Sequence, residues 1–313
     1  MSRKTSSKGS AGKRSGAKAS KVDDTPTEPQ APDADPVGIE AWAERVLKDL
    51  ADKGDADIDI MEGALALAVF DAPTEALDPY RRQLADMADA LDKVGVADDA
   101  SAEDRLAALN HVLFGLYGYS GDTESYDDLQ NANLIRVMDR RRGLPVALGI
   151  LMLHLARGRG WTMRGLDFPG HFLLQLDGPG ERLIVDPFNG GAALDASDLR
   201  ALLKAASGND AELTPDHYAA VSDRDILLRL QNNIKLRLVQ AKRIEAALGI
   251  VDAMLLFAPE KPWLWRESGL MNAHIGKLKT AVDALETYID RETRPGPRSE
   301  AQAMIDGLRG QMN

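Results

Sequence analysis

Apolar residues recur every three or four positions through the first part of the chain, and this spacing predicts a series of amphipathic helices. The pattern is clearest in four segments, at residues 39–52, 60–70, 80–94 and 102–118. Polar residues fill the positions between, as expected for helices that bury one face against a common core. A loop rich in Gly, Ser, Asp and Asn, residues 118–133, then leads into a different pattern.

The segment from Val146 to Leu155 is apolar almost all round, which predicts a helix inside a domain. Pro145 suits the first turn of this helix because its missing N–H would have no intrahelical partner there, and Gly143 permits a tight entry. The N-terminus of such a helix carries partial positive charge, a setting that lowers the pKa of cysteine in thiol enzymes.

Two runs of alternating apolar residues, 171–176 and 181–186, predict an antiparallel hairpin. The turn formers between them fit a four-residue loop from Asp177 to Gly180, a register in which His171 faces Asp186. Directly opposed side chains have Cβ atoms about 4.5 to 5.5 Å apart, so the spacing predicts a hydrogen bond between these two residues. Such a bond either orients an imidazole for catalysis or closes the hairpin as a structural pair.

The C-terminal part repeats with a period of 34 residues, which is the period of the tetratricopeptide repeat. The offset superposes Ala247 on Ala281, and Trp265 fits the first helix of a repeat. About two repeats fit, followed by a closing helix from Ser299 to Met312. Fewer than three repeats rarely stand alone, so we expect the array to pack on the preceding domain, where it either binds a protein or peptide or only caps the core.

These elements predict an α+β fold that is mostly helical, because helices outnumber a small antiparallel sheet. A further helix is expected at residues 199–207, after the hairpin. We expect three parts: a disordered tail at residues 1–37, a helical region with the sheet-containing core at 38–222, and helical repeats at 223–313.

Charge is distributed unevenly along this chain, whose net charge is −11. Residues 1–21 carry seven Lys and Arg and no acid, whereas residues 22–36 carry five Asp and Glu, four Pro and no base. This composition, with almost no large apolar side chain, predicts disorder. The acidic body disfavours nucleic-acid binding except through the basic tail, and the absence of aromatic residues from that tail argues against base stacking.

Several classes of protein are excluded by what the sequence lacks. No run of 18 apolar residues predicts a membrane span, and the basic tail has no apolar segment of a secretory signal. The absence of cysteine excludes disulfides and agrees with a cytoplasmic location. The five histidines are scattered and no phosphate-binding glycine loop occurs, so we expect no metal and no cofactor.

Three motifs together resemble the SirB-type transglutaminase-like proteins: NANLIRVMDRRRGLPVALGILMLHLARGRGW, PGHFLL and DPFNGG. Proteins of this family have a core of the papain-like superfamily followed by a tetratricopeptide region. The resemblance implies a catalytic histidine at His171, an aspartate at Asp186 and a cysteine position at or beside Pro145. Neither Pro145 nor its neighbours offer a thiol or hydroxyl, so thiol-protease or transglutaminase chemistry is excluded at this site.

Two functions remain open on these observations. In the first, a core without its nucleophile is a non-catalytic binding or regulatory protein whose repeats engage a protein partner. In the second, the protein is a hydrolase or transferase of unknown substrate, in which His171 acts as general base on water and Asp186 orients it.

Three further residues are candidates for binding. Asn189 lies beside Asp186 and could line the same pocket or make the turn out of the strand. Glu62 has apolar neighbours in its helix, so it is expected either to pair with an arginine of the run 140–142 or to lie at a solvated helix edge. Trp265 is a candidate contact for a partner of the repeats.

Overall fold

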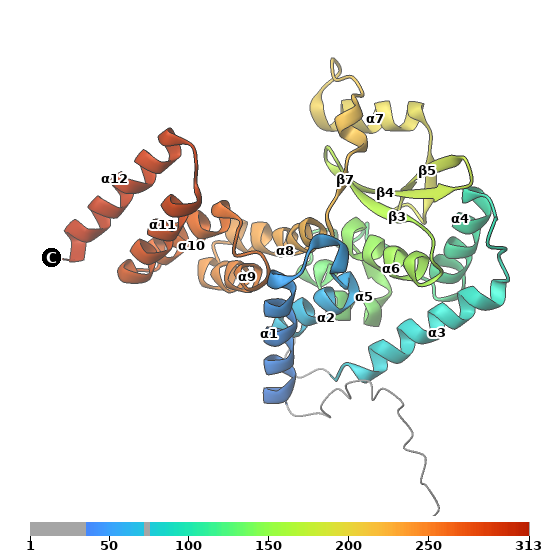
Figure 1. Ribbon diagram of the computed structural model, residues 1–313, viewed down its shortest axis with the longest axis horizontal. Coiled ribbons are helices and arrows are strands. Elements are labelled where there is room, and N and C mark those ends of the chain that lie inside the picture. The colour runs from blue at the N-terminus through green and yellow to red at the C-terminus, as the bar shows by residue number, and fades with distance from the viewer. Residues whose placement is uncertain (1–35, 72–75, 313) are drawn as a thin grey trace, which may run out of the picture. The chain divides into compact units, whose positions relative to one another are not determined.

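A computed structural model describes residues 36–71 and 76–312 of the chain (Figure 1). The tail predicted at residues 1–37 lies outside the described residues, apart from the two that begin the first helix. The four predicted N-terminal helices are confirmed, and the last of them continues as a π-helix. They are α1 (Pro36–Asp52), α2 (Ile60–Asp71), α3 (Asp78–Val94) and α4 (Ala102–Asn110), with the 3₁₀ helix η1 (Asp55–Asp57) after α1 and the π-helix η2 (His111–Leu116) after α4.

The helix α6 (Pro145–Gly158) is the centre of the core. Ten of its fourteen residues are buried, which confirms the prediction from its unbroken apolar run. The chain reaches it through the loop elements β1 (Ser120–Gly121), η3 (Leu129–Ala132), α5 (Leu134–Arg140) and β2 (Arg142–Gly143), of which β1 and β2 pair in parallel. Gly149 lets this helix approach the sheet, because a Cβ there would lie 2.5 Å from the ring of Phe172.

A five-stranded antiparallel sheet in the order β6-β5-β4-β3-β7 covers α6. Its strands are β3 (Met163–Phe168), β4 (His171–Gly178), β5 (Glu181–Asp186), β6 (Ala192–Leu194) and β7 (Ala220–Val221). Figure 1 shows α6 below this sheet and α7 (Ala196–Ser207) above it. Phe172 and Leu174 join the main core with α6, whereas Leu173 joins a second cluster with Leu199 and Leu203 of α7. The small sheet among many helices confirms the predicted α+β fold.

The predicted register of the hairpin is wrong by two residues. Leu174 pairs with Val185 and Gly178 with Glu181, so the loop is the dipeptide Pro179-Gly180 rather than four residues. Gly180 has φ +77°, which suits the third position of a type II turn after proline. Because the shift is an even number of residues, every side chain keeps its predicted face, but His171 and Asp186 are no longer opposite each other.

The predicted repeats are confirmed as two helix pairs and a closing helix. They are α8 (Asp223–Gln240), α9 (Ile244–Phe257), α10 (Pro262–His274), α11 (Leu278–Arg291) and α12 (Pro295–Met312). The starts of α9 and α11 are 34 residues apart, and the superposed Ala247 and Ala281 are both fully buried. The closing helix begins at Pro295 rather than Ser299, since proline is well suited to the first turn.

The repeats pack on the core, as expected for so short an array. Helix α9 lies against α1, and α8 lies against α2 (Figure 1). Helix α8 also contacts η3. The chain passes from the sheet into α8 through the short 3₁₀ helix η4 (Pro215–Tyr218) and β7. No helix in the described part of the chain is both long and apolar enough to cross a membrane.

Candidate functional site

The start of α6 is the position where the resemblance implies a catalytic cysteine. Leu144 is the N-cap, without a side-chain hydrogen bond to the helix, and Pro145 is the first helical residue. Gly121 lies beside this entry because it pairs with Gly143. The ring of Phe188 packs closely on Gly121, where an added Cβ would lie 2.6 Å from it. The helix start therefore has a proline and an adjoining aromatic ring where acyl transfer would need a nucleophile.

His171 opens β4 on the sheet face that α7 covers. It pairs directly with Phe168, which belongs to the α7 cluster together with Leu173. Phe172, the next residue, instead meets Gly149 of α6. Strand alternation thus directs the half-buried His171 away from the face on which α6 packs.

Asp186 uses its carboxylate to hold the turn that follows β5. Its oxygens accept hydrogen bonds from the backbone N–H of Phe188 at 2.9 Å and from the side-chain amide of Asn189 at 2.6 Å. The backbone N–H of Asn189 is at 3.4 Å. These bonds form an Asx-type turn, a common structural role for aspartate before a tight reversal. Asn189 therefore supports the turn, one of the two roles considered for it.

The predicted hydrogen bond between His171 and Asp186 is absent from the described residues. In the observed register, extrapolated past the end of β5, Phe188 is the residue opposite His171, and Asp186 is its diagonal neighbour. Diagonal neighbours lie about 7 to 8 Å apart, too far for the contact that direct opposition would give. The pair does not form the orienting half of a triad in this arrangement.

We expect His171→Gln to change the free energy of unfolding by less than about 0.5 kcal/mol, because the imidazole makes no hydrogen bond within the described chain. Asp186→Asn should lower the free energy of unfolding by about 1 kcal/mol, since the new side-chain amide can face the amide of Asn189, which donates to this carboxylate. Urea denaturation of both single variants and the double variant measures the coupling between them. A coupling energy well above about 0.5 kcal/mol would contradict the independence of the two residues.

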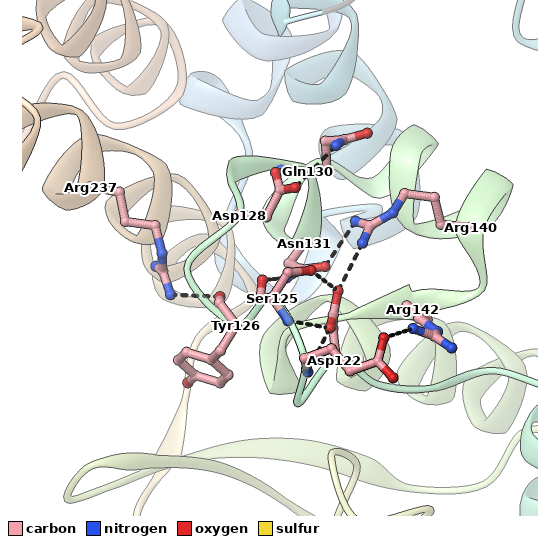
Figure 2. A network of polar contacts seen from close by, with 10 residues as sticks. Asp122, Ser125, Tyr126, Asp128, Gln130, Asn131, Arg140, Arg142 and Arg237 are labelled. Atoms are coloured by element: carbon pink, nitrogen blue, oxygen red, sulfur yellow. Dashed lines mark hydrogen bonds and ion pairs between the residues drawn. The ribbon is translucent and has the colours of Figure 1, made fainter.

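A polar network around Asp122 fixes the approach to α6 (Figure 2). The Asp122 side chain is 1% exposed, and one of its oxygens accepts from the backbone N–H groups of Glu124 at 3.1 Å and Ser125 at 2.9 Å. The other oxygen accepts from the Ser125 hydroxyl at 2.7 Å and from Arg140 at 2.8 Å. These donors, the Ser125 backbone N–H above all, hold the pKa of the Asp122 carboxyl well below its ordinary value.

Asn131 carries the same network to the first turn of α6. Its side-chain oxygen accepts from Arg140 at 2.9 Å, and its backbone oxygen accepts from the N–H of Leu144, also at 2.9 Å. Asn131 is fully buried. The motifs that predict the site do not include this loop, although an aspartate three residues before a serine is a recognisable turn signal.

Glu62 pairs with Arg81 of α3 rather than with an arginine of the run 140–142. The pair is bidentate, at 3.1 and 2.8 Å, and the Arg81 guanidinium lies 5.1 Å from the ring centroid of Trp42. The carboxylate, about one third exposed, raises the pKa of Arg81. Glu62 therefore joins α2 to α3 at the surface.

Trp265 contributes to the structure of the repeats. Its indole N–H donates to the backbone oxygen of Pro259 at 2.7 Å, and Arg291 lies over its ring at 5.3 Å. Trp263, two residues earlier, instead lines two cavities. That Trp265 contacts a partner of the repeats stays a prediction, and which of the two tryptophans lines a cavity depends on how α10 is rotated.

The two cavities lie along helices α8, α10 and α12 and share Trp263 as a wall. One, of about 370 Å³, is bounded by α8 and β3; the other, of about 490 Å³, is bounded by α11 and α12. We call them together the Trp263 groove. Its lining residues are Asp167, Val221, Asp225, Leu228, Arg229, Asn232, Pro262, Trp263, Arg266, Tyr288, Glu292, Arg294, Pro297 and Glu300.

Most charged groups in the Trp263 groove are already paired. Asp225 bonds Lys261 at 2.8 Å, and Glu292 bonds Arg294 at 2.8 Å and the Tyr288 hydroxyl at 3.1 Å. These partners, Arg294 first, lower the pKa of Glu292 to about 2. The described residues contain no group of three or more His, Asp or Glu that could hold a metal ion.

Two known families match successive parts of the chain. A family of the transglutaminase-like superfamily matches residues 78–232, and a tetratricopeptide repeat family matches residues 234–306. The first match contains α6, the sheet and the first part of α8, and the second contains the end of α8, the helices α9 to α11 and most of α12. No solved structure matches the chain significantly.

Several bacterial proteins are similar to this chain over most of their length. A UPF0162 protein of Vibrio cholerae is 31% identical over 242 residues, which is 77% of this chain and 89% of the relative. A UPF0162 protein of Xylella fastidiosa is 34% identical over 59% of this chain and 67% of its own length. Protein SirB1 of Salmonella typhimurium is 26% identical over 61% of this chain and 71% of its own length.

Proposed function

We propose that this chain, which belongs to the UPF0162 family and has a transglutaminase-like core, is a non-catalytic binding protein. In this proposal, the transglutaminase-like core is a scaffold, and a segment of a partner protein binds in the Trp263 groove of the repeats. Stacked helical pairs provide the extended surfaces on which repeat proteins hold their ligands.

The observation that carries this proposal is a set of free polar groups in the Trp263 groove. The side chains of Asn232 and Arg266, and the indole N–H of Trp263, make no hydrogen bond to any other residue in the described ranges. An asparagine amide offers both donors and an acceptor, as a peptide group does. Tryptophan and arginine are the residues that most often dominate binding energy at protein interfaces.

The surroundings of Trp263 would hold it ready for a partner. Lys235 of α8 is buried beneath it, with its ammonium 5.0 Å from the ring centroid and 2.6 Å from Glu267. The ion pair joins α8 to α10. Because both cavities also share Trp263 as a wall, they belong to one surface. A ring fixed in this way loses little conformational entropy on binding.

The contacts of the candidate catalytic residues in the core also support a non-catalytic function. Asp186 is engaged by its own turn, His171 lies on the α7 face, and the chain has no cysteine to place at Pro145. An enzyme that used His171 as general base would need an orienting partner that these contacts do not supply. We place the protein in the cytoplasm, in agreement with its lack of cysteine.

The proposal is tested by photo-crosslinking from inside the groove. Asn232 and Arg266 are replaced, one at a time, by p-benzoylphenylalanine in the full chain, and adducts formed in host cells are identified by mass spectrometry. The same partner protein should be captured from both positions. Lys279, exposed on α11 and outside both cavities, is the matched control position.

Trp263→Ala should weaken the captured partner's affinity at least tenfold, because truncating a buried aromatic anchor typically costs about 2 kcal/mol or more. His171→Gln should leave the affinity unchanged. Circular dichroism establishes that each variant is folded. Equal capture from position 279, or an affinity that Trp263→Ala does not change, would argue against a binding groove at this place.

A further inference from the structure

A third cavity lies where the core meets the repeats, away from the Trp263 groove. It has a volume of about 280 Å³ and opens between η3 and α5 on one side and α8 and α9 on the other. We call it the junction cavity. Its lining residues are Leu129, Gln130, Asn133, Arg136, Ile234, Leu238, Arg243, Ala246 and Ile250.

The walls of the junction cavity are mainly aliphatic. Ile234 and Leu238 come from α8 and Ile250 from α9, and all three are between 2% and 6% exposed. Leu129 and Ala246 are half-buried at its edge. Side chains that are so well fixed form a preshaped apolar surface, which is the usual lining of a site for a small molecule.

The polar groups of this cavity favour an anion. Its charged lining residues are Arg136 and Arg243, and neither aspartate nor glutamate lines it, although the whole chain has a net charge of −11. Arg136 lies 3.6 Å from Asp139 of its own helix. The guanidinium of Arg243 makes no ion pair or hydrogen bond with any residue that the structure describes.

The position of Arg243 is fixed by the backbone rather than by its side chain. It is the N-cap of α9, and its N–H donates to the backbone oxygen of Leu238 at 2.9 Å. The preceding Lys242 has φ +58°, an uncommon conformation for a residue with a side chain. The tight turn between α8 and α9 therefore brings a free guanidinium to the mouth of an apolar cavity.

We propose that the junction cavity binds a medium-chain aliphatic carboxylate, with the hydrocarbon against Ile234, Leu238 and Ile250 and the carboxylate against Arg243. The volume accommodates about nine non-hydrogen atoms if each takes up ~30 Å³, the share of a water molecule in the liquid. Octanoate is close to this size. The planar guanidinium matches a carboxylate with two parallel hydrogen bonds.

Isothermal titration of the full chain with octanoate tests the site. We expect one saturable site, with 1-octanol at least tenfold weaker because it lacks the charge that Arg243 would pair with. Arg243→Ala should weaken octanoate about tenfold, and because Arg243 is exposed this variant should fold normally. Ala246→Leu should abolish binding by filling the cavity. Arg200→Ala, an exposed arginine of α7, is the matched control and should bind as the unchanged chain does.

The proposal is overturned if octanoate does not bind at millimolar concentration, or if it binds with a stoichiometry above one that Arg243→Ala and Ala246→Leu do not alter. The second result would describe adsorption of an amphiphile to exposed apolar surface. Equal affinities for octanoate and octanol would also overturn it, because the arginine would then contribute nothing.

Discussion

Asp122→Asn is expected to lower the free energy of unfolding by about 2 to 4 kcal/mol. The new amide group would turn a donor toward the Ser125 hydroxyl or Arg140, which are donors themselves (Figure 2). Arg140 would then lose its anionic partner while still bonded to Asn131. Removing the charge of Asp122 costs more than the pair contributes, since Arg140, whose side chain is 27% exposed, regains only part of its hydration.

Urea denaturation monitored by circular dichroism measures this loss. Glu124→Gln is the matched control, because Glu124 lies in the same loop and pairs with Arg142 at 2.8 Å, yet its side chain is 78% exposed. The control should cost less than about 1 kcal/mol. If the free energy of unfolding fell by the same small amount in both variants, the network in Figure 2 would not contribute to the stability of the core.

The difference between the unchanged chain and Asp122→Asn should depend on pH in a defined direction. The pKa of the Asp122 carboxyl is lowered in the folded state, so the native state keeps this proton off at pH values where the unfolded chain binds it. The stabilisation is therefore complete above about pH 5 and is lost as the pH falls below about 4 toward the lowered pKa. The two denaturation midpoints should converge in acid.

The repeats and the helices could be predicted because their signals are local. A period of 34 residues aligns α9 with α11, and the spacing of apolar residues locates α1 to α4. Each such pattern contains many residues, so one unusual position does not change the element that the pattern predicts. The fully buried Ala247 and Ala281 show that the period reflects how closely the helices must pack.

The register of the hairpin could not be predicted as reliably, because it depends on where one turn begins. The four turn formers from Asp177 to Gly180 admit a two-residue and a four-residue loop. The structure uses Pro179-Gly180 and leaves Asp177 in the strand, where it pairs with Arg182 and bonds Arg164 of β3. The same dipeptide, Pro169-Gly170, makes the preceding turn, with Gly170 at φ +71°. Two Pro-Gly turns of one type in succession were the available signal.

The roles of the residues in the Trp263 groove and the Asp122 network could not be predicted from the sequence, for a different reason. Asn232, Trp263 and Arg266 are proposed to bind a partner because their polar groups make no hydrogen bond within residues 36–71 and 76–312, and that is a property of their surroundings rather than of any motif. Arg140 meets Asp122 across 18 positions of sequence. Spacing within a helix or strand gives no information about such contacts.

Arg224→Met is expected to destabilise the chain by about 3 to 5 kcal/mol, because Arg224 joins the repeats to the N-terminal helices. Its side chain is buried, with 6% of the residue exposed. One of its nitrogens donates to the backbone oxygens of Leu50 at 2.9 Å and Lys53 at 2.8 Å, at the end of α1, and another donates to the backbone oxygen of Phe257, at the end of α9. A cation at two helix C-termini satisfies carbonyls that lack intrahelical partners and opposes the partial negative charge there. Methionine keeps most of the volume but leaves these carbonyls buried without donors.

Hydrogen exchange distinguishes this joint from ordinary loss of packing. In Arg224→Met the amides in the last turns of α1 and α9 should lose protection together, before those of α6, since both helix ends depend on one guanidinium. Arg309→Met removes an exposed ion pair with Glu286 and should cost less than about 1 kcal/mol, with no change in either helix. If α9 lost protection while α1 kept it, the apolar contact of α9 with α1 alone would hold the repeats on the core. Arg224 would then not couple the unfolding of the core to that of the repeats.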